Sequence, residues 1–333
     1  MITLPTHIDK AITDILAKND PIFWLRSANS LSINYRAERI TPNFNYIKDF
    51  HDALGYLALR VSSTYSQIYG ALESIKELNP NWKPESILDL GSGPGTGIWA
   101  AAELFPSLNN AVAIERDKNF INIGQEISGS LNNIKVEWQQ TDLSKALPKL
   151  YENFDLVVIA NVLNEMDSDG IQKTLNFAKN HCNGIIVIIE PGTPYGYETI
   201  IETESLLHSP QSVLIAPYIQ NKFIDSEDVT FIQRIKRPDF QKRVRQVQRK
   251  KEIDKSKLLP PSDWEESKYY YLAYSKFKSE LSPTKRLLDK SKQFKPYMEI
   301  KALTKDGVKI EQIMKRDKIN YKIARKAKWG DIL

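Results

Sequence analysis

A short glycine-rich segment, Asp89 to Thr96, has the residue types and spacing of a loop that binds a small ligand. Glycines at alternate positions, Gly91, Gly93 and Gly95, let the backbone turn sharply and approach a ligand, and the N–H groups of a following helix bind anions. The segment lacks the third glycine of the dinucleotide fingerprint, because Thr96 stands there, and it lacks the lysine of a phosphate-binding P-loop. The segment therefore matches neither of these two motifs, although its glycines still fit a loop that binds a nucleotide-like ligand.

Three more polar residues follow apolar runs further along the chain. Glu115 is placed to accept hydrogen bonds from both hydroxyls of a ribose, Asp142 to receive the exocyclic amine of an adenine, and Asn161 to lie at the same rim. The alternative is that Glu115 and Asp142 are loop carboxylates with no ligand. The two interpretations differ in whether the sheet brings these residues together.

The elements that would position these residues alternate between short apolar runs and helical patterns. That alternation is typical of a doubly wound α/β sheet, in which ligands bind at the carboxyl ends of the strands. We predict strands at 87–90, 111–114, 134–138, 154–160 and 185–190, and helices at 97–104, 120–127 and 171–180.

The flanking segments are less regular. Apolar residues at three- and four-residue spacing predict one helix over 46–78, after an N-terminal helical lobe that includes 8–16. After the sheet we predict a helix at 198–208, strands at 213–216 and 230–235, a strand at 264–277 that returns to the sheet edge, and a hairpin of 297–303 with 308–314. The predicted organisation is a helical lobe over 1–80, an α/β core over 81–280 and a basic β extension over 281–333.

The net charge of +5 is unevenly distributed along the chain. Residues 1–200 hold 16 Lys/Arg against 23 Asp/Glu, whereas residues 201–333 hold 30 against 18. Basic residues crowd into an insertion at about 236–257. This asymmetry fits a polyanionic partner met by one end of the chain, and it fits a solvated basic surface equally well.

The glycine loop followed by Glu115, Asp142 and Asn161 at successive strand ends resembles the class I methyltransferases. The resemblance implies S-adenosylmethionine as cofactor and a Rossmann-like core. The residues that it implies as cofactor contacts are Asp89, Gly91, Ser92, Gly93, Gly95, Thr96, Glu115, Asp142 and Asn161.

Three segments together are similar to a narrower family, the methyltransferase-like proteins associated with the small ribosomal subunit of bacteria and mitochondria. They are 56–65, with its Tyr-Leu-Ala-Leu-Arg-Val start, 187–196, which contains Glu-Pro-Gly-Thr-Pro-Tyr-Gly, and the C-terminal 321–331. The resemblance implies work on the small subunit or its ribosomal RNA. The basic residues that we predict to contact that RNA are Lys242, Arg243, Arg245, Arg249, Lys250 and Lys251.

The chain departs from that family at one place. Many members carry cysteines for an iron–sulfur cluster after the strand that here ends at 216–217, but this sequence has only Cys182. No iron–sulfur cluster and no multi-cysteine metal site is therefore expected. The four histidines are scattered, so no metal site is predicted from them either.

The residues do not identify a catalytic base. The Asn/Asp-Pro-Pro-Tyr motif of many amino-group methylases is absent at 161–164, and Glu165 and Glu190 remain candidates for acceptor contact or for a structural role. Two functions stay open: a methyltransferase that acts on small-subunit ribosomal RNA, and a non-catalytic assembly factor that retains the fold. The N-terminal residues resemble no targeting segment and no apolar run reaches the length of a membrane span, so we expect a cytoplasmic protein without a membrane partner.

Overall fold

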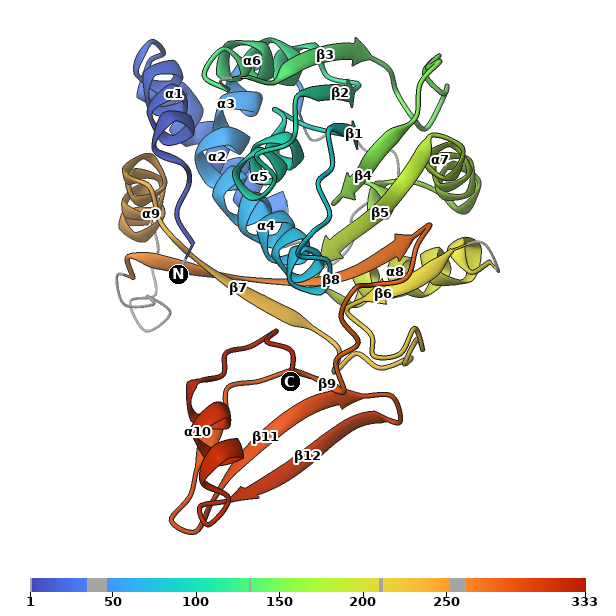
Figure 1. Ribbon diagram of the computed structural model, residues 1–333. Helices are drawn as coiled ribbons and strands as arrows, with labels where there is room; N and C mark the ends of the chain where they lie inside the picture. Colours follow the sequence, from blue (N-terminus) through green and yellow to red (C-terminus); the bar gives the residue numbers. More distant parts are fainter. Residues whose placement is uncertain (1, 35–46, 132, 210–211, 252–261) are drawn as a thin grey trace.

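The core of the protein is one eight-stranded sheet (Figure 1). The computed structural model describes residues 2–34, 47–131, 133–209, 212–251 and 262–333, and only the backbone of Asn34, Lys250 and Lys251. The strands are β1 (Ser86–Leu90), β2 (Asn110–Glu115), β3 (Lys135–Gln140), β4 (Phe154–Ala160), β5 (Cys182–Pro191), β6 (Val213–Ala216), β7 (Phe231–Lys236) and β8 (Trp264–Ser275). Their order is β3-β2-β1-β4-β5-β8-β6, with β7 also paired to β8. Strands β1 to β5 are parallel, which confirms the predicted doubly wound, Rossmann-like sheet.

The central strands end together at one edge of the sheet. Leu90 at the end of β1 lies beside Ile114 of β2 and Ile159 of β4. These strands are apolar runs buried on both faces, as expected for parallel strands covered by helices. The residues that follow them are therefore brought to a common rim.

Helices cover both faces of this sheet. The connecting helices are α5 (Thr96–Leu104), α6 (Lys118–Ser128), the 3-10 helix η1 (Leu163–Glu165), α7 (Ser168–Asn180) and α8 (Pro194–Leu207). In Figure 1, α5 lies to the left of the sheet, and α7 and α8 lie to the right. Side-chain caps start several of them: Asp117 accepts hydrogen bonds from the first turn of α6, and Thr193 does so for α8.

The N-terminal lobe is helical, as predicted, but its long helix is divided. Its elements are α1 (Thr6–Ala17), α2 (Pro21–Asn34), α3 (Phe50–Leu59) and α4 (Val61–Leu78). The prediction of one helix over 46–78 is wrong at Arg60, whose φ of −112° departs from helical geometry. Residue 46, where that prediction began, lies outside the described residues.

Strand β8 corrects a second prediction. It was expected at the sheet edge, but it lies between β5 and β6, antiparallel to both. Tyr274 illustrates the position, since it pairs with Ile186 of β5 and with Leu214 of β6. The basic insertion that precedes β8 contains the helix α9 (Asp239–Lys251), which packs against α2 and α3.

The C-terminal residues form a second, smaller sheet, drawn below the main sheet in Figure 1. Its elements are β9 (Lys285–Leu287), β10 (Lys292–Gln293), β11 (Tyr297–Thr304), β12 (Gly307–Met314) and the helix α10 (Lys318–Lys326). The predicted hairpin is confirmed, with Thr304 paired to Gly307 at its turn. Met298 and Ile300 of β11 pack with Ala324 of α10 on one face of this sheet.

Candidate functional site

The glycine loop turns through left-handed backbone at the end of β1. Gly91 and Gly93 have φ values of +71° and +54°, which residues other than glycine rarely adopt. A Cβ at Gly91 would lie 2.4 Å from Cγ2 of Val162, whereas a Cβ at Gly93 would meet nothing within 4 Å. Gly91 therefore allows close packing, and Gly93 presents bare backbone to open space.

Asp89 lies at the carboxyl end of β1 and is buried. Burial raises the pKa of its carboxyl group to about 7, although the backbone N–H groups of Ile98 and Gly97 favour the charged form and oppose that rise. Its Oδ2 has no hydrogen-bond partner among the described residues. A Cβ at Gly97 would lie only 2.6 Å from this oxygen, so the glycine makes room for the carboxylate.

Glu115, at the end of β2, holds the loop in place. Its Oε2 accepts a hydrogen bond from the N–H of Gly93 at 2.8 Å, and its Oε1 accepts one from the N–H of Asp117 at 2.8 Å. Burial raises the pKa of Glu115, and these two N–H donors oppose the rise. The side chain thus lies directly beneath the glycine loop.

Asp142 follows β3, and its carboxylate is held by its neighbours. Its Oδ1 accepts hydrogen bonds from the hydroxyl and the N–H of Ser144 at 2.6 and 3.1 Å, and Lys145 forms an ion pair at 2.9 Å. Partial burial acts to raise the pKa of Asp142, but these contacts outweigh it and the pKa is lowered. Asp142 therefore stays ionised more readily than Asp89 and Glu115, whose pKa values burial raises.

Asn161 follows β4 in left-handed backbone, with a φ of +57°. Its Nδ2 donates a hydrogen bond to Oε1 of Gln67 on α4 at 3.0 Å. Its Oδ1 is buried and has no partner among the residues that the structure describes. The amide is thereby fixed on one side and left with an unpaired acceptor on the other.

These residues line one pocket at the rim of the sheet. Of the nine predicted cofactor contacts, eight line it: Asp89, Gly91, Ser92, Gly93, Thr96, Glu115, Asp142 and Asn161. Gly95 lies outside the lining, where a Cβ would come within 3.3 Å of ring atoms of Trp138 and Trp99. The pocket opens to solvent at this rim, and the space between its lining residues is about 970 Å³ when its open mouth is included.

Sequence reasoning missed several residues of this lining. Tyr56 of α3 and Thr64 of α4 form one wall, and Phe120 and Met166 add apolar surface. Tyr56 lies in one of the segments that carried the family resemblance, but nothing in its spacing placed it at the pocket. A contact between an N-terminal helix and a strand end depends on tertiary packing alone.

An ion pair joins two elements across this pocket. Nη2 of Arg116, after β2, lies 2.9 Å from Oε2 of Glu165 in η1, and both residues line the pocket. Burial raises the pKa of Glu165 to about 7, and Arg116 opposes that rise. Of the two carboxylates considered for acceptor contact, Glu165 is thus at the pocket.

Glu190 is not part of the pocket lining. It is fully buried at the end of β5, and its Oε1 accepts a hydrogen bond from the N–H of Leu163 at 3.2 Å. Burial raises the pKa of this carboxyl well above its ordinary value. Its visible role is to hold η1 and with it Glu165.

Cys182, at the start of β5, is buried and unpaired, and burial raises the pKa of its thiol to about 11. It does not line the pocket. Within the described parts of the chain, no three His, Cys, Asp or Glu side chains are grouped so as to hold a metal ion. Within those same parts, no helix is both long and apolar enough to cross a bilayer.

The predicted RNA contacts lie on α9, whose apolar face packs inward through Phe240 and Val244. Arg243 is exposed and Arg249 is half-buried. Lys242 forms an ion pair with Asp239 at 3.0 Å. The side chains of Lys250 and Lys251 lie outside the described residues.

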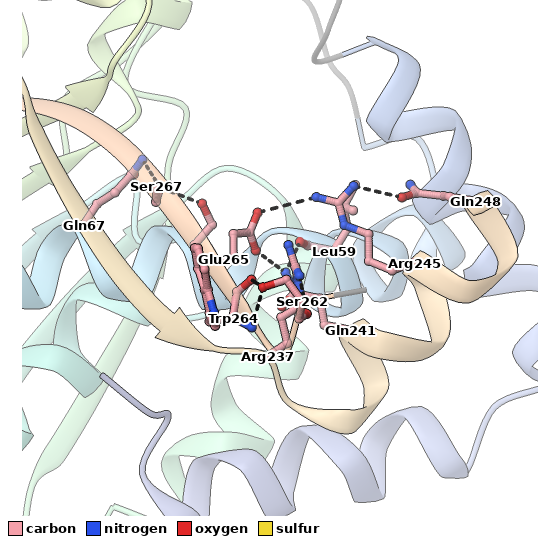
Figure 2. Close-up of polar contacts among 11 residues, drawn as sticks. Leu59, Gln67, Arg237, Gln241, Arg245, Gln248, Ser262, Trp264, Glu265 and Ser267 are labelled. Atoms are coloured by element: carbon pink, nitrogen blue, oxygen red, sulfur yellow. Dashed lines mark hydrogen bonds and ion pairs between the residues drawn. The ribbon is translucent and has the colours of Figure 1, made fainter. Parts of the chain in front are cut away.

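Arg245 points toward the protein rather than away from it (Figure 2). Its Nη2 lies 3.9 Å from Oε1 of Glu265 on β8, and the other oxygen of Glu265 accepts a hydrogen bond from Gln241. Gln241 also donates to the backbone carbonyl of Leu59 at 3.1 Å. These contacts fix α9 against β8 and α3, so Arg245 has a structural role that the sequence did not reveal.

Comparison with known proteins agrees with the second resemblance. The model of the family described as "Mitochondrial small ribosomal subunit Rsm22" matches residues 50–333. This chain belongs to the Rsm22 family. The match includes every lining residue of the pocket except Ile47, and also α9 and the C-terminal sheet.

Curated relatives of this Rsm22-family chain share only about a quarter of the aligned residues with it. The human protein named ribosome assembly protein METTL17, mitochondrial, is 26% identical over 46% of this chain and 35% of its own length. The Saccharomyces cerevisiae ribosome assembly protein RSM22, mitochondrial, is 27% identical over 46% of this chain and 32% of its own length. The matches thus span about a third of these relatives. Their names place them in mitochondria, whereas the N-terminal residues had led us to expect a cytoplasmic protein.

Solved structures similar to this Rsm22-family chain are also distant. An S-adenosylmethionine-dependent methyltransferase from Clostridium acetobutylicum is 14% identical, with a TM-score of 0.34, over 79% of this chain and 80% of its own. A Pyrococcus horikoshii protein described as a candidate RNA methyltransferase is 14% identical, with a TM-score of 0.39, over 74% of this chain and 97% of its own. Neither likeness bears on function, since both TM-scores lie below 0.5.

Proposed function

We propose that this chain binds S-adenosylmethionine and transfers its methyl group to ribosomal RNA of the small ribosomal subunit. The observation that carries the proposal is the pocket itself. Asp89, Glu115, Asp142 and Asn161 come from four different strand ends, and they converge there beside the open backbone of Gly93.

The polar atoms of this pocket fit that cofactor. Oδ2 of Asp89 and Oδ1 of Asn161 are buried acceptors without donors among the described residues. A buried polar atom without a partner costs about 1–3 kcal/mol, which a ligand with N–H donors would recover. S-adenosylmethionine carries an ammonium group and an adenine amine that can supply such donors.

The roles of the remaining residues follow from their chemistry. Each carboxylate oxygen of Glu115 accepts one backbone hydrogen bond and retains a lone pair, which suits it to a pair of ribose hydroxyls. Asp142 is ionised and half-buried, so it can accept from the adenine amine. Gly93 lets the ligand approach the main chain without steric conflict.

When bound, S-adenosylmethionine supplies an electrophilic methyl group on a sulfonium sulfur. The protein has to exclude water and to place the acceptor in line with that group. The ion pair of Arg116 and Glu165 lies at the pocket, and the buried Glu190 fixes the helix that carries Glu165. We assign these three residues to the part of the pocket that the cofactor leaves open, where they would hold the acceptor in position.

The proposal that ribosomal RNA is the acceptor rests on the basic charge of α9 and on the names of the relatives. The outer face of α9 presents Arg243 and Arg249, and arginine binds phosphate through planar, multidentate hydrogen bonds. The relatives are named as ribosome assembly proteins. Those names also agree with the second candidate, a non-catalytic assembly factor that retains the methyltransferase fold.

The deciding experiment compares ribosomal RNA from cells with the wild-type gene, without the gene, and with the Gly93→Arg variant. Mass spectrometry of modified nucleosides should find one methyl mark lost in both mutant strains. Calorimetry on the purified proteins should detect S-adenosylmethionine binding for wild type and none for Gly93→Arg or Asp89→Ala. Unchanged RNA with immature small subunits would instead support the assembly factor, and no binding by wild type would contradict the cofactor.

A further inference from the structure

The end of the C-terminal sheet that carries the β10–β11 turn has an unusual surface. We call this surface, made of Lys292, Phe294, Lys295, Tyr297, Met314, Lys315, Arg316 and Lys318, the C-terminal tip. The N–H of Phe294 donates to the carbonyl of Tyr297 at 2.9 Å, which closes the turn, and the N–H of Lys315 donates to the carbonyl of Pro296 at 2.9 Å. The turn and the end of β12 are therefore fixed side by side.

Two aromatic rings are stacked at this tip. The rings of Phe294 and Tyr297 lie with their centroids 4.9 Å apart and their planes 24° apart. Phe294 is 42% exposed although one of its neighbours is Tyr297. Met314 is paired with Tyr297 across the two strands and is 37% exposed. An exposed aromatic ring of this kind offers a flat surface on which another planar group can stack.

Cations surround these rings. The exposed basic residues of the tip are Lys292, Lys295, Lys315, Arg316 and Lys318, and none of them forms an ion pair with any residue that the structure describes. Two acidic residues lie nearby. Glu299 lies opposite Lys292 in the register of β10 and β11, and Asp317 caps α10. Residues 281–333 hold 15 Lys/Arg against six Asp/Glu, so the tip is the end of a strongly basic unit.

We infer that the C-terminal tip binds an unpaired stretch of RNA, with a base stacked on Phe294 and the flanking phosphates on the surrounding lysines and arginine. Surfaces that bind single-stranded nucleic acid combine a basic track with exposed aromatic rings, because every base has a π face. A base-paired duplex offers phosphates but no free base face to Phe294. The inference rests on the RNA partner proposed above and adds a surface separate from both the pocket and α9.

The test measures binding of the full chain to a labelled single-stranded oligoribonucleotide of about 12 nucleotides, a length typical of such surfaces. The same strand annealed to its complement is the comparison. We expect Phe294→Ala to weaken single-strand binding at least fivefold, Phe294→Trp to restore it, and duplex binding to change little. Tyr151→Ala is the matched control, because Tyr151 is fully exposed and lies on the acidic half of the chain.

A triple variant, Lys295→Ala with Lys315→Ala and Arg316→Ala, should weaken both RNAs and flatten the dependence of affinity on salt. Unchanged single-strand affinity of Phe294→Ala would overturn the inference. The inference would also be overturned if the tip variants bound both RNAs as tightly as wild type does but no longer bound ribosomal proteins, because the partner of the tip would then be a protein. If Arg243→Ala with Arg249→Ala weakens RNA binding while the tip variants do not, only the tip is refuted, whereas a wild type that binds no RNA would refute both surfaces.

Discussion

Gln67 of α4 and Asn161 at the end of β4 are joined by a hydrogen bond of 3.0 Å between Oε1 and Nδ2. Nε2 of Gln67 donates in turn to the hydroxyl of Ser267 at 2.7 Å and to the carbonyl of Lys268 at 3.0 Å. Because both of these partners are acceptors for Nε2, the amide of Gln67 can present only its oxygen to Asn161. Asn161 must then donate to Gln67, which leaves its own buried oxygen without a donor among the described residues.

Replacement of Gln67 tests this arrangement. Gln67→Ala removes a buried side chain and the acceptor of Nδ2 of Asn161, so we expect the free energy of unfolding to fall by about 2 kcal/mol. Cofactor affinity should also fall, because Asn161 loses its fixed orientation. Urea unfolding and calorimetry measure the two effects. Gln172→Ala, at an exposed position of α7, should change neither, and a Gln67→Ala protein as stable as wild type would contradict the role of the bridge.

The strand-end residues of the pocket could be predicted from the sequence because parallel strands bring their carboxyl ends to one rim. Asp89, Glu115 and Asn161 needed only the count of apolar runs before them to be placed there. Gln67 could not be found in this way. It lies in the middle of a regular helix, and its contact with Asn161 is 94 residues distant in sequence.

Two errors in the predicted fold have physical causes of the same kind. The helix break at Arg60 lies within Leu59-Arg60-Val61, which contains neither glycine nor proline, so no local signal marks it. The position of β8 between β5 and β6 depends on which strand edges of the sheet are still unpaired when β8 joins it. Apolar patterning shows that β8 is buried, but it does not show between which neighbours.

Two arginines of α9, the exposed Arg243 and the half-buried Arg249, give a prediction about salt. The double variant Arg243→Ala with Arg249→Ala should weaken RNA binding and reduce the slope of log affinity against log salt by about 0.7–1 per arginine that contacts a phosphate. Filter binding over a series of salt concentrations measures the slope. Lys10→Ala with Lys173→Ala removes the same charge from α1 and α7 and should leave the slope unchanged. Equal slopes for the α9 variant and wild type would mean that α9 is only a solvated basic face.

Arg286 is expected to hold the C-terminal sheet to the core. It is almost completely buried, with Nε donating to the carbonyl of Pro217 at 2.9 Å and Nη1 to that of Gly330 at 2.8 Å. Arg286→Leu leaves both carbonyls without these charged donors, so we expect a loss of about 2–4 kcal/mol in the free energy of unfolding. Hydrogen exchange should show faster exchange in β9 and the last residues than in β1. The exposed Arg316→Leu serves as the control for stability, and equal loss from both variants would refute the assignment.

The pKa of Asp89 leads to a prediction about pH. Burial raises this pKa to about 7 from an ordinary value near 4, so in the protein without cofactor the protonated carboxyl is favoured and the folded state loses stability as pH rises between these two values. A cationic ligand needs the ionised form. Its affinity should therefore increase as pH rises through about 7, with release of a proton on binding below that pH. Calorimetry in buffers of different ionisation enthalpy measures both quantities.

The variants that isolate this effect follow from the neighbouring carboxyl groups. Glu165 also has a pKa of about 7, and Glu115 lies close enough to raise that of Asp89, so each could contribute to the same pH profile. Asp89→Asn should bind the cofactor weakly and with little dependence on pH, because the titrating group is gone. Glu165→Gln should keep the rise in affinity through about pH 7. If Asp89→Asn retains that rise and Glu165→Gln loses it, then Glu165, rather than the carboxylate at the end of β1, controls binding of the cation.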